Sequence, residues 1–191
     1  GSAQYGSNVN GVQWLDTVRL HTQNLLTRTQ QFTATVWAED SGLASPATRT
    51  DVNATAPDGQ AVASMITTSA GGVYIRQGIG VGLVRPRYTL RVGVWVKAAP
   101  TSPAANVRLT VNNTAAWNTG TSTKVALTSE WQYISAQSLG DVSATGAYMI
   151  IGAQDAAGAA DATCYGNILV AYPSAQTNTP SFLSTYLPRT T

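Results

Sequence analysis

The sequence of 191 residues is poor in charge and in cysteine. Charged residues make up 10% of the chain, against the ~25% of an average globular domain, so Thr, Ser, Asn, Gln and Gly must supply most of its polar surface. Cys164 is the single cysteine, which excludes an intramolecular disulfide and with it the disulfide-stapled class of secreted domains. The formal net charge of +2 favours neither nucleic acid nor a membrane surface as a partner.

Long apolar runs are also missing. No run of ~18 apolar residues exists, so the sequence predicts no transmembrane helix, and its start lacks the basic-then-apolar pattern of a signal peptide. Gly1 and Ser2 resemble the remnant of a cleaved tag, and we expect the chain to be a piece of a longer protein. Residues 1–23 are interpreted as this remnant followed by a stem or short helix that mediates oligomerisation. Residues 24–191 are then predicted to form one domain.

Groups that carry catalysis are few. The one histidine, His21, lies in the expected stem, so a Ser-His-Asp or Cys-His arrangement would have to recruit it from outside the domain. One cysteine and one histidine are too few for zinc, and no pair of carboxylates lies within the alternating segments, as a glycosidase would need. The sequence therefore predicts that the protein is not an enzyme, and a depolymerase is the lowest-ranked alternative.

What the chain does contain is short alternating segments. Residues 88–97 read Tyr-Thr-Leu-Arg-Val-Gly-Val-Trp-Val-Lys, and this period of two predicts a half-buried strand. Its second face carries Thr89, Arg91, Gly93, Trp95 and Lys97. About eight to ten such strands, separated by Gly, Pro and Asn turns, predict an all-β antiparallel sandwich. The remaining strands are expected at 24–26, 32–37, 61–68, 73–79, 107–111, 125–127, 131–136, 148–153 and 164–172.

The order of these segments resembles a known family. The relevant stretches are Asn24-Leu25-Leu26 with Phe32 and Trp37, Ala56 to Ala61, Tyr88 to Ala98, Glu130 to Tyr133 and Pro180 to Thr191. Together they resemble the jelly-roll domain of phage tail and virion proteins, which is similar to the carbohydrate-binding modules of cellulases and xylanases. The resemblance implies a ligand site on a concave sheet face or on loops at one edge. It also implies a structural calcium near the first and last strands, but the few acidic residues, with Asn167 where relatives often carry an acid, do not support this ion, so no cofactor is predicted.

The tryptophans are the informative aromatic residues. Trp37 and Trp131 fall where such a fold packs its core, and we expect both to be buried. Trp95, on the second face of its strand, and Trp117, in a loop flanked by amides, are predicted to stack on sugar rings; packing against a neighbouring chain is the competing interpretation. If the strands at 73–79 and 107–111 neighbour the strand at 88–97, further polar contacts to the sugar come from one shared face. These contacts are expected from Tyr74, Arg76, Arg91, Arg108 and Asn112.

These observations predict a non-catalytic domain of a phage tail fibre or virion that recognises a host cell-surface glycan. Its expected partners are a bacterial surface polysaccharide, other virion proteins and further copies of itself, with a trimer favoured. No nucleic acid and no membrane insertion are expected, and the expected location is the virion, outside the cell. The alternative is a structural decoration or assembly domain of the virion, whose exposed aromatic residues are buried between subunits.

Overall fold

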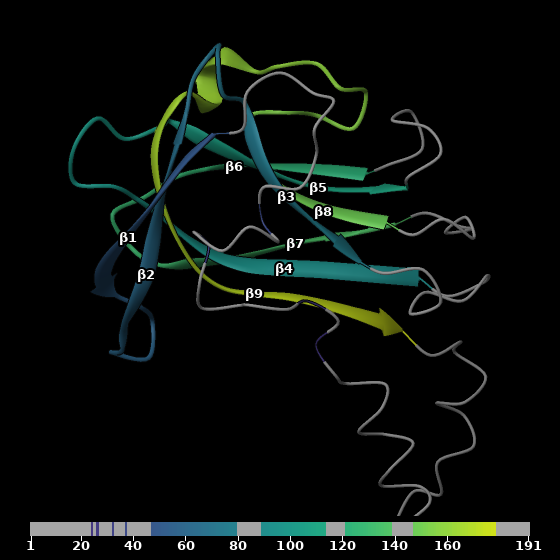
Figure 1. Ribbon diagram of the computed structural model, residues 1–191, viewed down its shortest axis with the longest axis horizontal. Coiled ribbons are helices and arrows are strands. Elements are labelled where there is room, and N and C mark those ends of the chain that lie inside the picture. The colour runs from purple at the N-terminus through teal and green to yellow at the C-terminus, as the bar shows by residue number, and fades with distance from the viewer. Residues whose placement is uncertain are drawn as a thin grey trace, which may run out of the picture.

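The computed structural model shows two antiparallel β-sheets that form a sandwich (Figure 1). It describes Asn24, Leu26, Phe32, Trp37 and residues 47–79, 89–113, 121–138 and 147–178. One sheet has five strands in the order β1-β2-β9-β4-β7, and the other has four in the order β3-β8-β5-β6. The prediction of an all-β jelly-roll sandwich is thereby confirmed.

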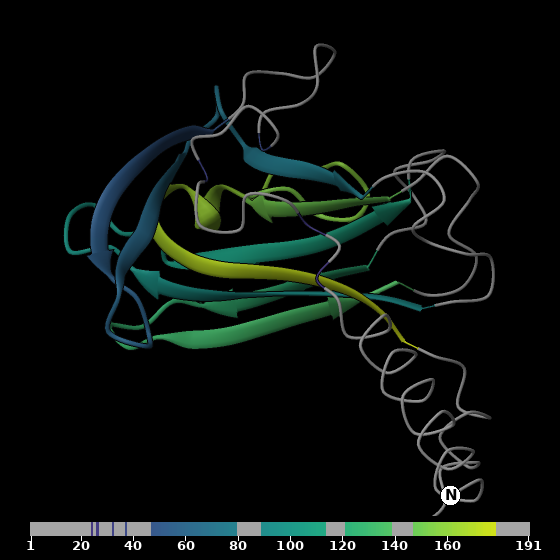
Figure 2. The same ribbon diagram turned by 60° about the horizontal axis from the view of Figure 1, so that its bottom comes forward.

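The strands of the five-stranded sheet are β1 (Thr48–Thr55), β2 (Ala61–Thr68), β4 (Thr89–Ala98), β7 (Gln132–Gln137) and β9 (Gly166–Asn178). The four-stranded sheet contains β3 (Tyr74–Ile79), β5 (Asn106–Asn113), β6 (Thr121–Ala126) and β8 (Ala147–Gly152). A short 3-10 helix, η3 (Ala162–Cys164), precedes β9. The strand β9 is long and curved: its first half pairs with β2, and it runs along β4 for most of its length (Figure 2).

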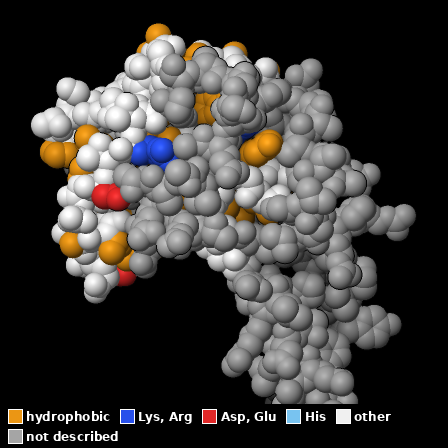
Figure 3. All heavy atoms as spheres, viewed as in Figure 1, with side chains coloured by type: hydrophobic (Ala, Val, Ile, Leu, Met, Phe, Trp, Pro, Cys, Tyr) orange, Lys and Arg blue, Asp and Glu red, His pale blue; other side chains and the backbone are white. Residues whose placement is uncertain are grey.

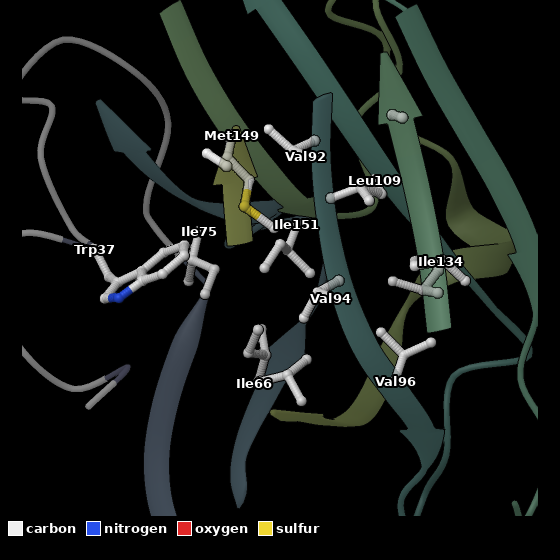
Figure 4. Packing of buried hydrophobic residues seen from close by; sticks show 14 of the residues in the cluster. Trp37, Ile66, Ile75, Val92, Val94, Val96, Leu109, Ile134, Met149 and Ile151 are labelled. Carbon is white, nitrogen blue, oxygen red and sulfur yellow. The ribbon is translucent and has the colours of Figure 1, made fainter. Parts of the chain in front are cut away.

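The hydrophobic core lies between the two sheets and follows the expected period of two. The inward side chains of β4 are at most 1% exposed, and they face buried side chains of β5 and β8 (Figure 4). The inward residues of β4 are Leu90, Val92, Val94 and Val96, and their counterparts include Leu109, Met149 and Ile151. The outer face of β4 therefore carries Arg91, Gly93, Trp95 and Lys97, as predicted.

The segment before β1 contributes aromatic residues to this core. Phe32 and Trp37 are both fully buried, with ring centroids 4.7 Å apart, which confirms the prediction that Trp37 is a core residue. The strands expected at 24–26 and 32–37 are wrong for the positions that the structure describes, none of which lies in a strand. Instead, the side chain of Asn24 donates to the carbonyl of Pro173 at 2.9 Å and accepts from the backbone N–H of Ala175 at 2.9 Å. A side-chain amide thus occupies the edge of β9 beyond the end of its pairing with β2.

The strand β1 was not predicted, and its composition explains why. Its sequence, Thr-Arg-Thr-Asp-Val-Asn-Ala-Thr, has no alternating apolar face, because β1 is an edge strand of the sheet whose side chains are nearly all exposed. The predicted stem of residues 1–23 lies outside the described residues. Within the described ranges, no helix is long and apolar enough to span a membrane.

Candidate functional site

Aromatic side chains gather on the outer face of the five-stranded sheet. We call Trp95, Trp131, Tyr133 and Tyr172 the aromatic face. Trp95 on β4 lies directly opposite Tyr133 on β7, and their ring centroids are 5.5 Å apart with an interplanar angle of 59°. Tilted aromatic pairs at this distance attract one another beyond simple area burial. Tyr133 nevertheless remains 47% exposed, which leaves a broad aromatic surface available to a ligand.

Gly93 determines how Tyr133 lies. A Cβ atom on Gly93 would be 2.0 Å from the Tyr133 hydroxyl oxygen and 2.5 Å from its Cζ, so the phenol lies directly over the glycine backbone. Its hydroxyl lies 3.3 Å from Oγ of Ser174, and Ser174 donates in turn to the Gly93 carbonyl at 3.4 Å. The absence of a side chain at position 93 therefore lets the ring of Tyr133 rest against the sheet.

A β-bulge places Tyr172 on the same face. Gly93 faces Ser174 and Trp95 faces Ala171, so β9 has one more residue than β4 between these two pairs. Tyr172 has a φ of 50°, a left-handed conformation that is uncommon outside glycine, and bulges of this kind re-aim side chains.

A hydrogen bond fixes the Tyr172 side chain. Its hydroxyl donates to Oδ2 of Asp58 at 2.6 Å, in the turn between β1 and β2. This bond raises the pKa of Tyr172 to about 12. The same bond, followed by one from the backbone N–H of Gln60, lowers the pKa of Asp58.

Trp131 also belongs to this outer face. Its indole Nε1 donates to the carbonyl of Thr55 at 3.1 Å, and the ring packs in a small outer cluster whose buried members are Ala56, Ala63 and Ala171. The prediction that Trp131 lies in the core between the sheets is therefore wrong. Buried Ile134 and Ala136 of the following strand point inward, so Trp131 and Tyr133, which share the other phase of the alternation, point outward.

Beyond Gly93, the outer face becomes polar. Gly93 is flanked by Ser135 on β7 and Ser174 on β9, and the next outward residue of β4, Arg91, by Gln137 and Gln176. Arg91 is exposed, and its Nη2 donates to Oγ of Ser135 at a long 3.4 Å. A row of hydroxyls and then a row with a guanidinium and two amides thus adjoin the aromatic face. Charged side chains are also few on the described part of the side of the molecule that Figure 3 shows.

The structure divides the predicted sugar-binding residues between opposite sheets. Trp95 and Arg91 lie on the outer face of the five-stranded sheet. Tyr74 and Arg76 are on β3, and Arg108 is on β5, both in the four-stranded sheet. The expectation that β3 and β5 neighbour β4 is wrong, because both pair with β8 instead. Asn112 lies on β5 by its backbone, whereas its side chain and the whole of Trp117 fall outside the described residues.

The predicted residues of the four-stranded sheet make contacts within the protein. Arg76 is 4% exposed, and its guanidinium carbon lies 4.2 Å from the centroid of the Tyr148 ring. Burial lowers the pKa of Arg76. Tyr74 is 8% exposed, and burial raises its pKa. Neither side chain offers the exposed surface that Tyr133 does.

Arg108 takes part in an ion-pair cluster. Its Nε and Nη2 contact Oδ2 of Asp161 at 3.0 and 2.9 Å, and Lys124 reaches the same oxygen at 2.8 Å. Thr163 donates to the other carboxylate oxygen from its hydroxyl and backbone N–H. The hydrogen bonds from Lys124 and then from Thr163 lower the pKa of Asp161 strongly. The cluster holds the connection before β9 against β5 and β6.

Sequence reasoning missed several residues of this outer face. A signal for Tyr133 was present, because it alternates with Ile134 in the predicted strand at 131–136. Ser135 follows from the same alternation. Tyr172 could not be assigned to a face, since the bulge in β9 breaks the period of two at that position.

The resemblance implies calcium at the start of β9, where the polar side chains bond to other groups of the protein. Oδ1 of Asn167 accepts from the Thr67 hydroxyl at 2.8 Å, and its Nδ2 donates to the carbonyl of Thr101 at 2.8 Å. The Thr68 hydroxyl donates to the Cys164 carbonyl at 2.6 Å. No group of three His, Cys, Asp or Glu side chains that could hold a metal occurs in the part of the chain that the structure describes. These residues do not fit a calcium ion, which takes ~6–8 oxygen ligands.

Comparison with known proteins identifies the fold. No family model matches the chain, and no curated protein matches it. Among solved structures, the chain is similar to the CBM22-1 xylan-binding domain of Xyn10C from Paenibacillus barcinonensis, with 11% identity, a TM-score of 0.52, and coverage of 83% of this chain and 97% of that domain. It is also similar to TmCBM61, solved in complex with β-1,4-galactotriose, with 14% identity, a TM-score of 0.50, and coverage of 82% and 99%.

A third similar structure comes from a virus. It is the enzymatically active domain of tailspike protein 4 from bacteriophage CBA120, with 10% identity and a TM-score of 0.54, over 81% of this chain and 21% of that one. At such identities the likeness concerns the fold, and one fold can host several functions. The chain therefore has the jelly-roll sandwich found in carbohydrate-binding modules and in a phage tailspike.

Proposed function

We propose that this domain binds a glycan on the aromatic face and does not act on it chemically. The single observation that carries the proposal is the exposed ring of Tyr133, held over Gly93 and paired with Trp95. The apolar C–H faces of a sugar stack on such rings, and its hydroxyls bind nearby polar groups. Ser135, Ser174 and Arg91 supply hydrogen-bonding groups next to the rings.

The fold supports this proposal. Two of the similar structures are binding modules, one named for xylan and one solved with a galactotriose. The tailspike likeness supports the finer proposal that the glycan is a polysaccharide of a bacterial host and that the domain belongs to a phage tail or virion, acting outside the cell as part of a trimer. In the described residues, the carboxylates of Asp58 and Asp161 are engaged by Tyr172 and Arg108, which supports a role in binding without catalysis.

The test is binding of the intact protein to an array of glycans and purified bacterial polysaccharides. Removing one stacked ring should weaken binding about 5- to 150-fold, by analogy with the ~1–3 kcal/mol measured for base stacking on aromatic residues. We expect this loss for Tyr133→Ala and Trp95→Ala. The control is Val52→Ala, which truncates an exposed apolar side chain on the edge strand β1. Normal binding by both aromatic variants would refute the aromatic face as the site, and Trp117→Ala would then test the predicted loop tryptophan.

A second candidate function is virion assembly, with the aromatic face buried between subunits. Its supporting observation is the same exposed Tyr133, because subunit interfaces are enriched in tyrosine and tryptophan. The two functions differ in a measurable way. A stable oligomer in analytical ultracentrifugation that dissociates in Tyr133→Ala, together with no binding to any glycan, would support assembly.

A further inference from the structure

We propose that the glycan is acidic and that Arg91 binds a carboxylate carried by one of its sugars. This inference rests on the proposed function, since it names the chemistry of the ligand at the same face. Its basis is the juxtaposition of an exposed guanidinium with the aromatic face. Arg91 forms no ion pair with any carboxylate in the described ranges, and its hydrogen bond to Ser135 is long, at 3.4 Å.

The other arginines that the structure describes are engaged more closely by the protein. Arg108 contacts Asp161 through two nitrogen atoms. Arg49 donates to the carbonyl of Phe32 at 3.0 Å, and Arg76 is buried over the ring of Tyr148. Arg91 therefore keeps a planar fork of N–H donors available to solvent. This fork matches the two oxygens of a carboxylate, which a guanidinium binds with two parallel hydrogen bonds.

The direction of the Arg91 side chain places this fork beside the bound sugar. Arg91 faces Gln137 across the β4–β7 pair, but its Nη2 reaches Ser135, which faces Gly93. The side chain thus leans along the strand toward the ring of Tyr133. Arg91 and Trp95 are four positions apart, about 13 Å along an extended strand. A sugar chain that stacks on Tyr133 and Trp95 would therefore bring its next ring to the guanidinium.

The carboxylate that contacts the aromatic face is already engaged. Asp58 accepts the hydroxyl of Tyr172 at 2.6 Å. The residues beside Arg91 are neutral amides and hydroxyls, which can donate to a carboxylate or accept from a sugar hydroxyl. A carboxylate on the glycan would thus complete an ion pair that the described protein residues leave unformed.

The experiment uses calorimetric titration with matched pairs of ligands. Oligomers of galacturonate, of alginate and of glucuronoxylan are each compared with the same oligomer after its carboxylates have been reduced to alcohols. We expect the intact protein to bind at least one acidic form about tenfold more tightly than its reduced form, as for a hydrogen-bonded charged group at a partly exposed site. Arg91→Gln should remove this preference, so that the variant binds the acidic and the reduced forms with equal affinity.

Two variants separate the site from general charge effects. Lys97→Gln removes the same charge from the same face of the same strand, six positions away, and should leave the preference intact. Arg91→Lys keeps the charge without the planar fork and should retain only part of the preference for the acidic form. Higher salt should weaken the preference, since exposed charges are screened.

The outcomes distinguish this inference from the function on which it rests. Equal binding of acidic and reduced forms, lost in Tyr133→Ala but unaffected by Arg91→Gln, would overturn the acidic ligand and keep glycan binding. A sulfated dextran that bound through Arg91 better than every carboxylated oligomer would overturn the carboxylate as the recognised anion. No binding to these oligomers or to any glycan on the array would overturn both proposals.

Discussion

Gly93→Ala should reduce glycan binding without unfolding the protein. The added Cβ would lie 2.0 Å from the hydroxyl oxygen of Tyr133 and 2.5 Å from its Cζ, so the phenol must swing away from the sheet. The backbone of Gly93 needs no left-handed conformation, because its φ lies outside the range that disfavours side chains. The substitution therefore changes the position of one ring and little else.

The expected change in stability is small because two effects oppose each other. Displacing Tyr133 loses its pairing with Trp95, about 0.5–1.5 kcal/mol, and its exposed contact with Ser174, which contributes about 0.5 kcal/mol or less at such a distance. Replacing a strand glycine with alanine returns about 0.5–1 kcal/mol. The free energy of unfolding should thus change by about 1 kcal/mol or less. Glycan affinity, by contrast, loses a stacking surface of ~1–3 kcal/mol, which corresponds to roughly 5- to 150-fold weaker binding.

The assay pairs calorimetric titration of a glycan from the array with urea denaturation of the same variants. Gly78→Ala is the matched control, because its Cβ would meet Tyr148 at an ordinary 3.5 Å on the opposite sheet. If Gly93→Ala acts through the phenol, it should have no further effect on binding in a Tyr133→Ala background. An equal loss of affinity in that background, or a loss of several kcal/mol in stability, would refute this reasoning.

Further predictions concern the hydrogen bonds and the core. In absorbance titration, Tyr172 should ionise at a pKa of about 12, and Asp58→Asn should bring it back toward the ordinary 10.0. The contribution of this bond to stability is complete below pH 10 and lost as the pH rises toward 12, a loss that Tyr172→Phe should not show in alkaline unfolding. The lowered pKa of Asp161 means that its ion pairs with Arg108 and Lys124 stabilise the protein above the ordinary carboxylate pKa and lose this effect as the pH falls through the lowered value. Asp161→Asn should lower the urea midpoint at neutral pH but not in strong acid, and should leave glycan affinity unchanged. Trp37→Ala, in the core, should cost about 3–5 kcal/mol of unfolding free energy, measured by the same denaturation.

The sequence predicted the core strands well because their burial imposes a period of two. The predicted strand at 61–68 coincides with β2, and the one at 88–97 differs from β4 by a single position at each end. The edge strand β1 was missed because an exposed strand needs no apolar face. The interaction of Asn24 with β9 could not be predicted from the sequence either, because a single side chain that bonds to the backbone of a strand produces no alternating pattern.

The candidate site was only half predictable, for a topological reason. Alternation assigned Trp95 and Arg91 correctly to the outer side of their strand. It could equally well assign Arg76 and Arg108 to an outer side, but it could not tell that their strands belong to the opposite sheet. From β2 onward, consecutive strands lie in opposite sheets except for β5 and β6, so β4 pairs with β7 and β9. The register that brings Tyr133 beside Trp95 is a property of such long-range pairing.

The polarity of the outer face helps to separate its two proposed functions. Subunit interfaces are enriched in arginine as well as in tyrosine and tryptophan, but a guanidinium buried there without an anion would carry a desolvation cost of several kcal/mol. Arg91 lies one row beyond Ser135 and Ser174, and its Nη2 reaches Ser135, so a partner subunit that covered the rings would also cover the charge. A glycan leaves part of this surface hydrated and can satisfy hydroxyls, amides and the guanidinium individually. The exposed ring of Tyr133, next to a guanidinium that forms no ion pair in the described ranges, therefore favours a hydrated ligand on this face. If copies of the chain assemble, we expect their contact on another surface of the domain.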